Sequence, residues 1–346
     1  MDYYAGIDVS LEWSSVCIVD ASGKIVREDK VASEPEVLIA WFGSLGLSLD
    51  RIGLEAGPLS QWLYAAMREA GLAVELIETR HVRAALSAMP VKTDRNDARG
   101  IGQLMRLGWF RPVHCKSVAA QEVRALLTAR KLVQSKLYDV EMSLRGILRG
   151  FGLKVGPTRS KRFAARIREL VAGQATLEVV AAALLAAHEV LLREFSGFEK
   201  RVRAMARFDG RARLLMSAPG VGAIVALTYV SAVDDPARFT SSKGVGAHFG
   251  LTPKKYQSGK TDVTGAISKI GDRSVRTALY EAAHTILTRS VKASGLKNWA
   301  MRLARRAGAK KAKVALARKL AVILHRMWVD GASFAYGKSD NLAVAA

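Results

Sequence analysis

Four acidic residues have types and positions that suit metal chemistry. Asp94 and Asp97 stand three residues apart in VKTDRNDARG, at the expected start of a helix, so both side chains fall on one face of its first turn. Asp8 in GIDVS and Glu55 in GLEAG each end an apolar segment, among neighbours that make an unpaired carboxylate costly. Carboxylates are hard oxygen ligands for Mg²⁺ or Mn²⁺, and a metal pair activates one oxygen and stabilises another as it leaves. If these segments adjoin, the four acids predict a divalent-metal site.

The aspartate pair also has a simpler interpretation. An aspartate in the first turn of a helix is often an N-cap or a favourable partner of the helix dipole. The metal hypothesis rests on the coincidence of all four acids at the ends of predicted elements. In that hypothesis the cations Lys92, Arg95 and Arg99 approach the phosphate backbone of a nucleic acid.

A second candidate is the glycine turn PGVGAIVA at 219–226. Gly220 and Gly222 would let backbone N–H groups approach a phosphate without interference from a Cβ atom. This predicts a helix-hairpin-helix-like element that contacts nucleic acid through its backbone. An ordinary corner between two helices explains the same residues.

A third candidate is Ser258, in a polar segment rich in cations. A serine nucleophile needs positive charge for the phosphoryl group and a base for its own proton. Cations around it meet the first need, and they are Lys254, Lys255, Lys260, Lys269, Arg273 and Arg276. The nearest histidines, His248 and His284, are ten or more residues away. Since Ser-Gly is ordinary turn chemistry, the residues alone do not single out Ser258.

The elements that must position the acids are predicted by hydrophobic pattern. Strands are expected over 3–9, 13–20, 25–31, 51–57 and 72–78, with helices over 35–46 and 58–71. The order β-β-β-α-β-α-β is that of a ribonuclease H-like sheet, in which the ends of the first and fourth strands are adjacent. A helix from Asp94 to about Leu107 can then pack beside those ends.

The rest of the chain is predicted to be mostly helical. Two long helices, over 118–150 and roughly 161–209, predict a helical hairpin or coiled-coil arm, although a plain bundle with a solvated basic face fits as well. A corner at 214–233, a glycine-rich segment and a basic helical tail follow. Trp299 and Trp328 in that tail could stack on nucleobases, but a place in the core explains them better.

The charge is distributed unevenly along the 346 residues. Residues 1–100 hold 10 Lys and Arg against 15 Asp and Glu, a net of −5, and residues 101–346 hold 43 against 16, a net of +27. This split predicts an acidic, metal-binding head on a body that binds polyanions. A basic ribosome-associated or membrane-surface protein is the alternative. Half of the residues are hydrophobic, which excludes a disordered basic tail as a description of the whole chain.

The ordered string of motifs resembles a known family. GIDVS, LEAGP, KTDRNDA, PGVG, FxxxKxxxxxxGLTP, QSG and ISKxGDxxxR resemble the DEDD transposases of the Piv/MooV type, the recombinases of the "IS-one-ten" group of insertion sequences. The resemblance covers about residues 3–110 and 212–290. Each motif is weak by itself, and their order is specific.

The resemblance implies roles for individual residues. Asp8, Glu55, Asp94 and Asp97 match the acids of the RuvC-like domain, which bind Mg²⁺ or Mn²⁺. Ser258 matches the nucleophile, which cuts and rejoins DNA through a serine-linked 5′-phosphate. These five residues would form one composite catalytic site.

The resemblance also implies an architecture and partners. The domains would be a RuvC-like one over 1–110, a coiled-coil arm over 111–210 and a mostly helical transposase domain over 211–346. Donor and target DNA would pair with a noncoding guide RNA, the bridge RNA. Dimers would assemble to tetramers, so that one site draws its acids and its serine from different subunits.

A cytoplasmic setting is expected, with association with the bacterial nucleoid during activity. The two cysteines, Cys17 and Cys115, show neither a disulfide framework nor metal-ligand spacing. Neither a signal peptide nor an uninterrupted apolar span is predicted.

Three functions remain open at this point. The first is a transposase that uses Ser258 and the four acids, or a DNA invertase of the same family. The second is a RuvC-like, metal-dependent, structure-specific endonuclease in which water is the nucleophile. The third is a nucleic-acid-binding protein without catalytic activity, whose acids are structural.

Overall fold

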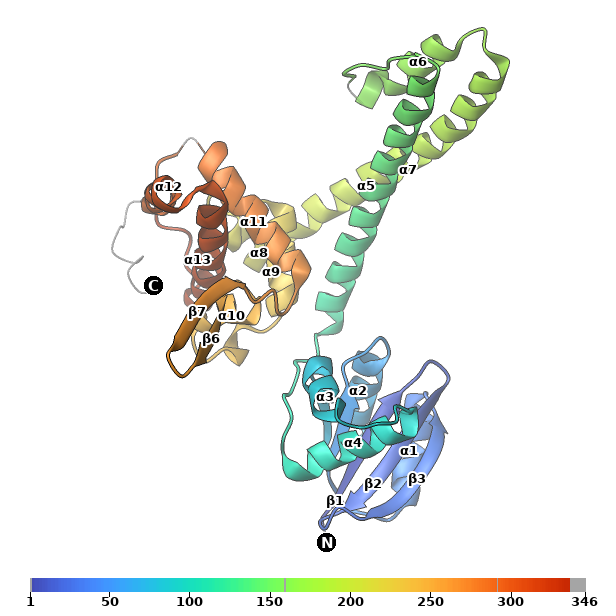
Figure 1. Ribbon diagram of the computed structural model, residues 1–346, viewed down its shortest axis with the longest axis vertical. Coiled ribbons are helices and arrows are strands. Elements are labelled where there is room, and N and C mark those ends of the chain that lie inside the picture. Colours follow the sequence, from blue (N-terminus) through green and yellow to red (C-terminus); the bar gives the residue numbers. More distant parts are fainter. Residues whose placement is uncertain (1, 159, 291, 337–346) are drawn as a thin grey trace. The chain divides into compact units, whose positions relative to one another are not determined.

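The computed structural model divides into two compact units, Met1–Lys116 and Ser117–Ala346 (Figure 1). It describes residues 2–158, 160–290 and 292–336. The first unit ends close to the predicted border at 110. The second unit holds both the arm and the helices that follow it, so the further division at 210 stays a prediction.

The first unit is built on a five-stranded sheet in the predicted element order. Its strands are β1 Tyr3–Val9, β2 Trp13–Asp20, β3 Ile25–Ala32, β4 Leu49–Glu55 and β5 Val74–Ile77. The spatial order is β3-β2-β1-β4-β5. The pairs β1–β2 and β2–β3 are antiparallel, whereas β1–β4 and β4–β5 are parallel. The first and fourth strands are therefore neighbours, as the predicted sheet requires.

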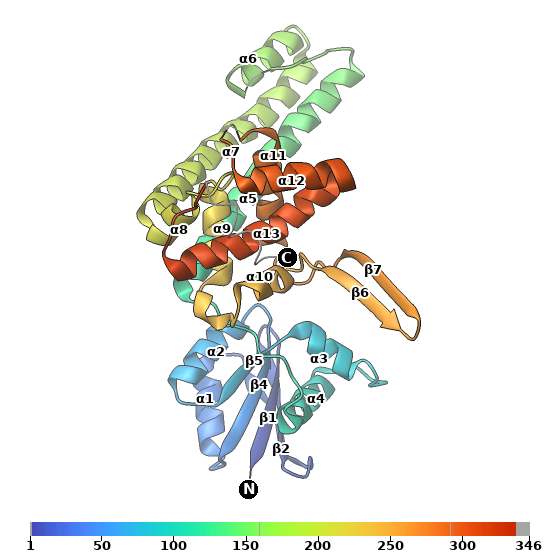
Figure 2. The same cartoon turned by 90° about the vertical axis from the view of Figure 1, so that its left-hand side faces the viewer.

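Helices cover both faces of this sheet (Figure 2). On one face lie α1 Pro35–Ser44 and α2 Ser60–Glu69, and on the other lie α3 Thr79–Leu86 and α4 Asp94–Leu107. Successive residues of β1 point to opposite faces of the sheet. Ala5 and Ile7 pack in the core on the side of α1 and α2, whereas Gly6 faces α4. The sequence did not predict α3, and it predicted the bounds of α4 correctly.

Helix α4 lies unusually close to β1, because Gly6 has no side chain. A Cβ atom on Gly6 would lie 2.2 Å from the carbonyl oxygen of Ala98 and 2.3 Å from the nitrogen of Gly102. Any other residue at position 6 would push the helix away from the sheet. This contact fixes where the first turn of α4 can lie.

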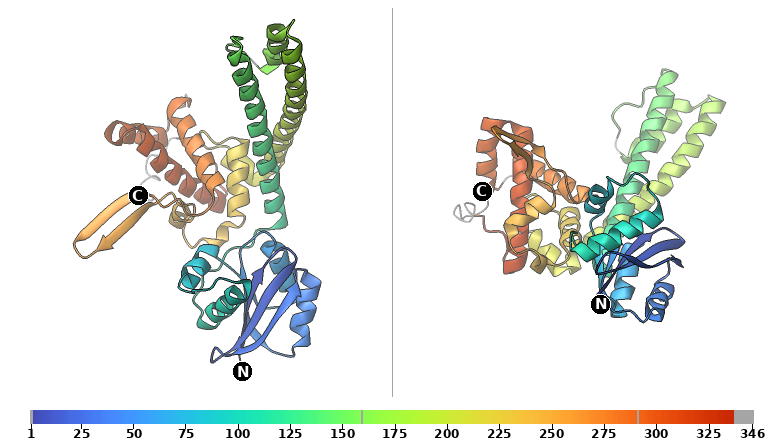
Figure 3. Two further views of the ribbon diagram at one scale, coloured as in Figure 1. Left: turned by 45° about the vertical axis from the view of Figure 1, so that its right-hand side comes forward. Right: turned by 60° about the horizontal axis from the view of Figure 1, so that its bottom comes forward.

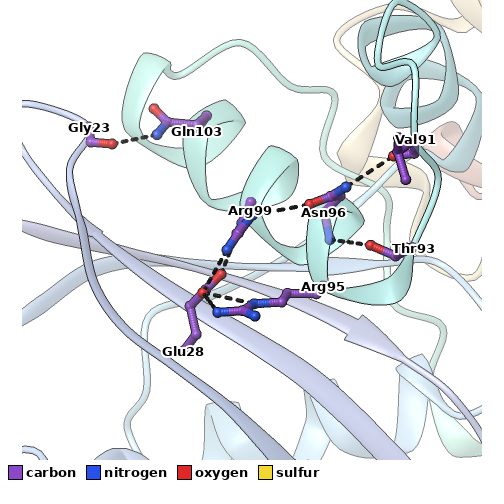
Figure 4. Close-up of polar contacts among 8 residues, drawn as sticks. All are labelled: Gly23, Glu28, Val91, Thr93, Arg95, Asn96, Arg99 and Gln103. Atoms are coloured by element: carbon purple, nitrogen blue, oxygen red, sulfur yellow. Dashed lines mark hydrogen bonds and ion pairs between the residues drawn. The ribbon is translucent and has the colours of Figure 1, made fainter.

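A carboxylate on β3 holds the same helix from the side (Figure 4). Glu28 accepts hydrogen bonds from Arg95 Nε and Arg99 Nη2, each at 2.9 Å, and its side chain is only 12% exposed. Gln103 adds a hydrogen bond from Nε2 to the carbonyl oxygen of Gly23 at 2.7 Å. Both arginines that were expected to approach DNA phosphates are thus paired with Glu28, and a phosphate contact by either one stays a prediction.

The second unit begins with a helical arm. Its helices are α5 Val118–Gly150, α6 Ser160–Val171 and α7 Ala175–Phe208. Leu144, Phe163, Ile167 and Leu185 belong to the apolar cluster at its far end, which all three helices share. The predicted single helix over 161–209 is thus wrong in one respect: the chain breaks between α6 and α7, where Gly173 has a φ of +81°.

Helix α7 is the one described helix long and apolar enough to cross a membrane by length and composition, with 22% of its most apolar window buried. It packs along α5, however, and its buried His188 ring lies 2.9 Å from a carboxylate oxygen of Glu141 on that helix. A buried ring nitrogen that is satisfied by a partner on the neighbouring helix is typical of helices that pack on each other.

The remaining helices of the second unit surround a buried one. They are α8 Gly210–Leu215, α9 Ala223–Val233, α10 Ser242–His248, α11 Arg273–Thr288, α12 Gly295–Ala307 and α13 Ala309–Asp330, with a 3₁₀ turn at Pro236–Arg238. Every residue of α9 from Val225 to Val233 is buried. A two-stranded hairpin, β6 Pro253–Ser258 and β7 Thr261–Ile267, projects from these helices (Figure 3). The sequence did not predict this hairpin.

Glu28→Gln is expected to lower the free energy of unfolding by about 1–3 kcal/mol, because two guanidinium groups lose a charged acceptor. Hydrogen bonds from Arg99 and Arg95 hold the pKa of Glu28 at about 2, below its ordinary 4.5. The stabilisation is therefore present above pH 4.5 and is lost as the pH falls toward 2. Urea unfolding followed by circular dichroism over this pH range measures it.

The matched control is Glu34→Gln, because the Glu34 side chain makes no capping hydrogen bond. Equal stability of the two variants at neutral pH would contradict the role given to Glu28.

Candidate active site

Two of the four acids lie side by side at one end of the sheet. Asp8 is the next-to-last residue of β1, and Glu55 is the last residue of β4. The parallel register pairs Ile7 with Leu54, so the following residues on both strands are Asp8 and Glu55. Both side chains are half-buried.

The other two acids occupy the first turn of α4. The N-cap is Thr93, whose hydroxyl oxygen accepts the N–H of Asn96 at 3.2 Å. Asp94 is exposed, and Asp97 is half-buried with a carboxylate oxygen 4.0 Å from Lys92 Nζ. Because Thr93 caps the helix, capping does not explain either aspartate.

Electrostatics join the four acids into one cluster. Burial and, to a lesser extent, the charges of Asp94, Asp97 and Glu55 together raise the pKa of Asp8 to about 6, against a smaller opposing effect of Lys92. Burial also raises the pKa of Glu55, with a contribution from Asp97. Mutual repulsion of this kind is the electrostatic cost of a carboxylate cluster with too little positive charge.

These residues fit a divalent cation by their chemistry. Four carboxylates offer the hard oxygen ligands that Mg²⁺ and Mn²⁺ prefer, and their repulsion would be relieved by positive charge among them. In the described part of the chain, however, no three acidic, histidine or cysteine side chains are already close enough to hold one ion. The acids are thus gathered at one sheet end, and their side chains would have to turn inward to bind a cation.

Ser258 lies at the tip of the β6–β7 hairpin. The sequence predicted a polar loop, whereas Ser258 is the last residue of β6 and pairs with Thr261 across the turn formed by Gly259 and Lys260. All residues of β6 are exposed. The hairpin contains no histidine, so a base for the serine proton has to come from another segment.

The cations predicted to bind nucleic acid differ in their surroundings. Lys254, Lys260 and Arg273 are exposed, and Lys255 forms an ion pair with Asp262 at 3.2 Å. Lys269 is also exposed.

Arg276 has a structural role. Its Nη1 donates to the carbonyl oxygens of Phe249, Ile270 and Gly271 at 3.2, 2.8 and 3.0 Å. These three main-chain acceptors account for the position of the Arg276 side chain. Its predicted contact with a nucleic acid stays a prediction.

The two glycines of PGVG also differ. Gly220 has a φ of +74°, and a Cβ atom there would lie 2.5 Å from the carbonyl oxygen of Ala282 on α11. Packing therefore requires glycine at position 220. Gly222 is the N-cap of α9, is exposed, and has open space around it. A phosphate contact by this turn stays a prediction.

Sequence reasoning missed the residues that position the acids. Glu28 anchors α4 from a strand 67 residues away from Arg95, and the Thr79 hydroxyl donates a hydrogen bond at 2.9 Å to the carbonyl oxygen of Ala56, the residue after Glu55. Neither has a local signal. Thr93 could have been found, since Thr before an Asp-rich first turn is a common N-cap pattern.

Known proteins resemble this chain over most of its length. A model described as "Transposase IS116/IS110/IS902 family" matches residues 212–298, and a DEDD transposase model of the IS110 type matches residues 5–152. The chain is 29% identical to the transposase for insertion sequence element IS1111A of Coxiella burnetii, over 92% of this chain and 87% of that protein. It is 28% identical to a "Probable family 20 transposase" of Pseudomonas aeruginosa, over 79% and 82%. The matched segments contain the four acids and Ser258.

Asp8→Asn is expected to stabilise the metal-free protein at neutral pH. The raised pKa means that ionised Asp8 destabilises the fold, so wild-type stability falls as the pH rises from about 4 to about 6 and stays lower above it. The variant should lack this fall and gain about 1–2 kcal/mol at pH 7, since water still screens part of the repulsion. Thermal unfolding in the presence of a chelator measures the difference. A variant that is less stable than wild type at pH 7 would contradict the electrostatic cluster.

Proposed function

The chain belongs to the IS116/IS110/IS902 family of transposases, and on that basis we propose that it cuts and rejoins DNA strands with Ser258 and the four acids Asp8, Glu55, Asp94 and Asp97. It is an insertion-sequence transposase, an enzyme that acts on DNA. Beyond this, we propose a serine nucleophile, a divalent metal at the four acids, a guide RNA and an oligomeric assembly.

The observation that carries the proposal is the grouping of four carboxylates from three elements at one sheet end. Strands β1 and β4 contribute one acid each, and α4 contributes two. A fold keeps a repulsive cluster of this kind when the cluster serves a function, because the repulsion costs stability. Together with the strand order β3-β2-β1-β4-β5, it supports a ribonuclease H-like, RuvC-like domain.

The acids would hold divalent metal, Mg²⁺ or Mn²⁺, which DEDD transposases typically use. When bound, such an ion stabilises charge on attacking and leaving oxygens. Lys92, which is 88% exposed, lies beside Asp97 and can meet a DNA phosphate at the edge of the cluster.

Ser258 would be the nucleophile. Its Oγ gives its proton to a base from another segment and attacks the phosphorus, the bond from phosphorus to the 3′ oxygen breaks, and the 3′ oxygen leaves as a hydroxyl after it gains a proton. The 5′-phosphate stays on the serine until a 3′-hydroxyl of the exchange partner attacks it and frees the serine. Exposed Lys254 and Lys260 on the same hairpin are suited to the phosphate charge.

The acids and the serine lie in separate compact units of the chain. A composite site in a homo-oligomer, a dimer that assembles to a tetramer, would allow the two parts to come from different subunits. A noncoding bridge RNA would supply sequence specificity by base pairing with donor and target DNA, as in other guided systems. The net charge of +27 over residues 101–346 suits a body that holds more than one nucleic acid strand.

A second function is favoured by one observation. The hairpin provides no histidine to take the serine proton. This favours a nuclease in which metal-activated water at the four acids is the nucleophile, because such an enzyme needs no proton transfer from Ser258. The two functions differ in a covalent intermediate, which only the serine mechanism forms.

Ser258→Ala is expected to abolish a covalent protein–DNA adduct that the wild type forms with its native flanking DNA. The measurement is DNA that stays bound to the protein after lysis in denaturant. Thr261→Ala is the matched control, because Thr261 pairs with Ser258 across the same turn and leaves the proposed nucleophile in place. Recombination products that persist in Ser258→Ala without any adduct would establish the metal-water nuclease instead.

A further inference from the structure

A pocket of ≈ 570 Å³ lies at the root of the β6–β7 hairpin, within the second unit. Leu251 and Ile267 line it from the hairpin side, and Val314 and Ala315 line it from α13. Its size is in the range of small-ligand sites, and its walls are mainly apolar. The cavity is distinct from the four acids, which belong to the other unit.

An aromatic ring and a buried cation form one wall of this pocket. Trp299 of α12 is half-buried, and the Nζ of Lys319 lies 4.4 Å from the centroid of its ring. Lys319 is itself only 7% exposed, and burial lowers its pKa. The ammonium over the indole is a favourable cation–π contact, which holds the Trp299 ring in place at this wall.

The rim of the pocket carries further positive charge. Lys310 and Lys311 are exposed in the first turn of α13, and Arg318 lies two turns further along. Cations in the first turn of a helix oppose the helix dipole, and that turn contains no acid to compensate them. No acidic residue lines the pocket. This arrangement favours an anion at the mouth.

We propose that this pocket holds one unstacked nucleobase, with the phosphate of the same nucleotide at Lys310 and Lys311. Aliphatic walls and Trp299 suit the faces of a base, and base–aromatic contact is tolerant of sequence. The rim cations suit the phosphate. An apolar segment of a second protein copy would fill the walls but would leave the rim without a counter-charge.

The position of the pocket sets the distance between the held nucleotide and Ser258. The inference from this distance rests on the proposed function. Strand β6 runs from Pro253 at the pocket to Ser258 at the tip. Five residue steps of an extended strand span roughly 17 Å, which is about five nucleotide steps along one strand of stacked DNA. The held nucleotide would thus lie several nucleotides away from the phosphate that Ser258 attacks, and it would anchor the strand beside the cleavage position.

Val314→Trp tests the pocket by filling it from the half-buried wall of α13. The probes are a fluorescent oligothymidylate of about eight nucleotides, the same backbone with abasic sites, and an oligouridylate. Fluorescence anisotropy is measured on the full chain in a Ser258→Ala background, so that the outcome does not depend on strand cleavage. The variant is expected to bind at least one of the two base-bearing strands about tenfold or more weakly and to bind the abasic strand as the wild type does.

The rim is tested by a matched pair of double variants. Lys310→Ala with Lys311→Ala removes two exposed cations at the mouth, and Arg305→Ala with Arg306→Ala removes two exposed cations of α12 that do not line the pocket. The first pair is expected to weaken binding of all the strands more than the second pair does.

Several results would overturn the proposal. They are equal binding of both oligothymidylate and oligouridylate by wild type and Val314→Trp, an equal loss for the abasic strand, or a change of oligomeric state in Val314→Trp without a change in oligonucleotide binding. A loss confined to oligothymidylate assigns the nucleotide to DNA, and a loss confined to oligouridylate assigns it to RNA. Because neither readout uses the serine, failure here leaves the strand-transfer proposal intact.

Discussion

The contact between Gly6 and α4 is the constraint on which the first unit depends. With no Cβ atom at position 6, the backbone of α4 comes within van der Waals reach of β1, and no larger residue fits there. Glu28 then holds the helix from the side through Arg95 and Arg99. These two features place the first turn of α4 at the sheet end where Asp8 and Glu55 lie. Packing, rather than a local acid motif, therefore brings the carboxylates together.

The electrostatics of the two units follow the uneven charge of the chain. The acidic cluster raises the pKa of Asp8 to about 6, so the fold carries a repulsion that a divalent cation would remove. Elsewhere, the exposed hairpin and the rim of the pocket carry cations with few neighbouring acids. The two units are therefore suited to different parts of the transposase reaction. The first unit suits the binding of metal, and the second suits the binding of phosphates beside the proposed nucleophile Ser258.

Much of the fold followed from the sequence, because hydrophobic period and turn chemistry are local. The five strands and the bounds of α4 were predicted, since each has a clear apolar pattern. The break between α6 and α7 and the β6–β7 hairpin were not predicted. Helical spacing continues on both sides of Gly173, and the hairpin residues are exposed, so no apolar alternation marks them. Of the site, the four acids and Ser258 came from motifs, whereas Glu28 depends on a contact between distant segments.

Titration calorimetry of Mn²⁺ binding to the full chain tests the acidic cluster most directly. Wild type should bind the ion and release protons on binding between about pH 5 and pH 7, because the cation displaces the proton of Asp8. The Asp97→Asn variant should bind Mn²⁺ at least about tenfold more weakly, which is the usual effect of losing a metal ligand or a carboxylate that supports one. Asp50→Asn, at the opposite end of β4 from Glu55, should bind as the wild type does. Equal affinity in Asp97→Asn and wild type would contradict a metal site at the four acids.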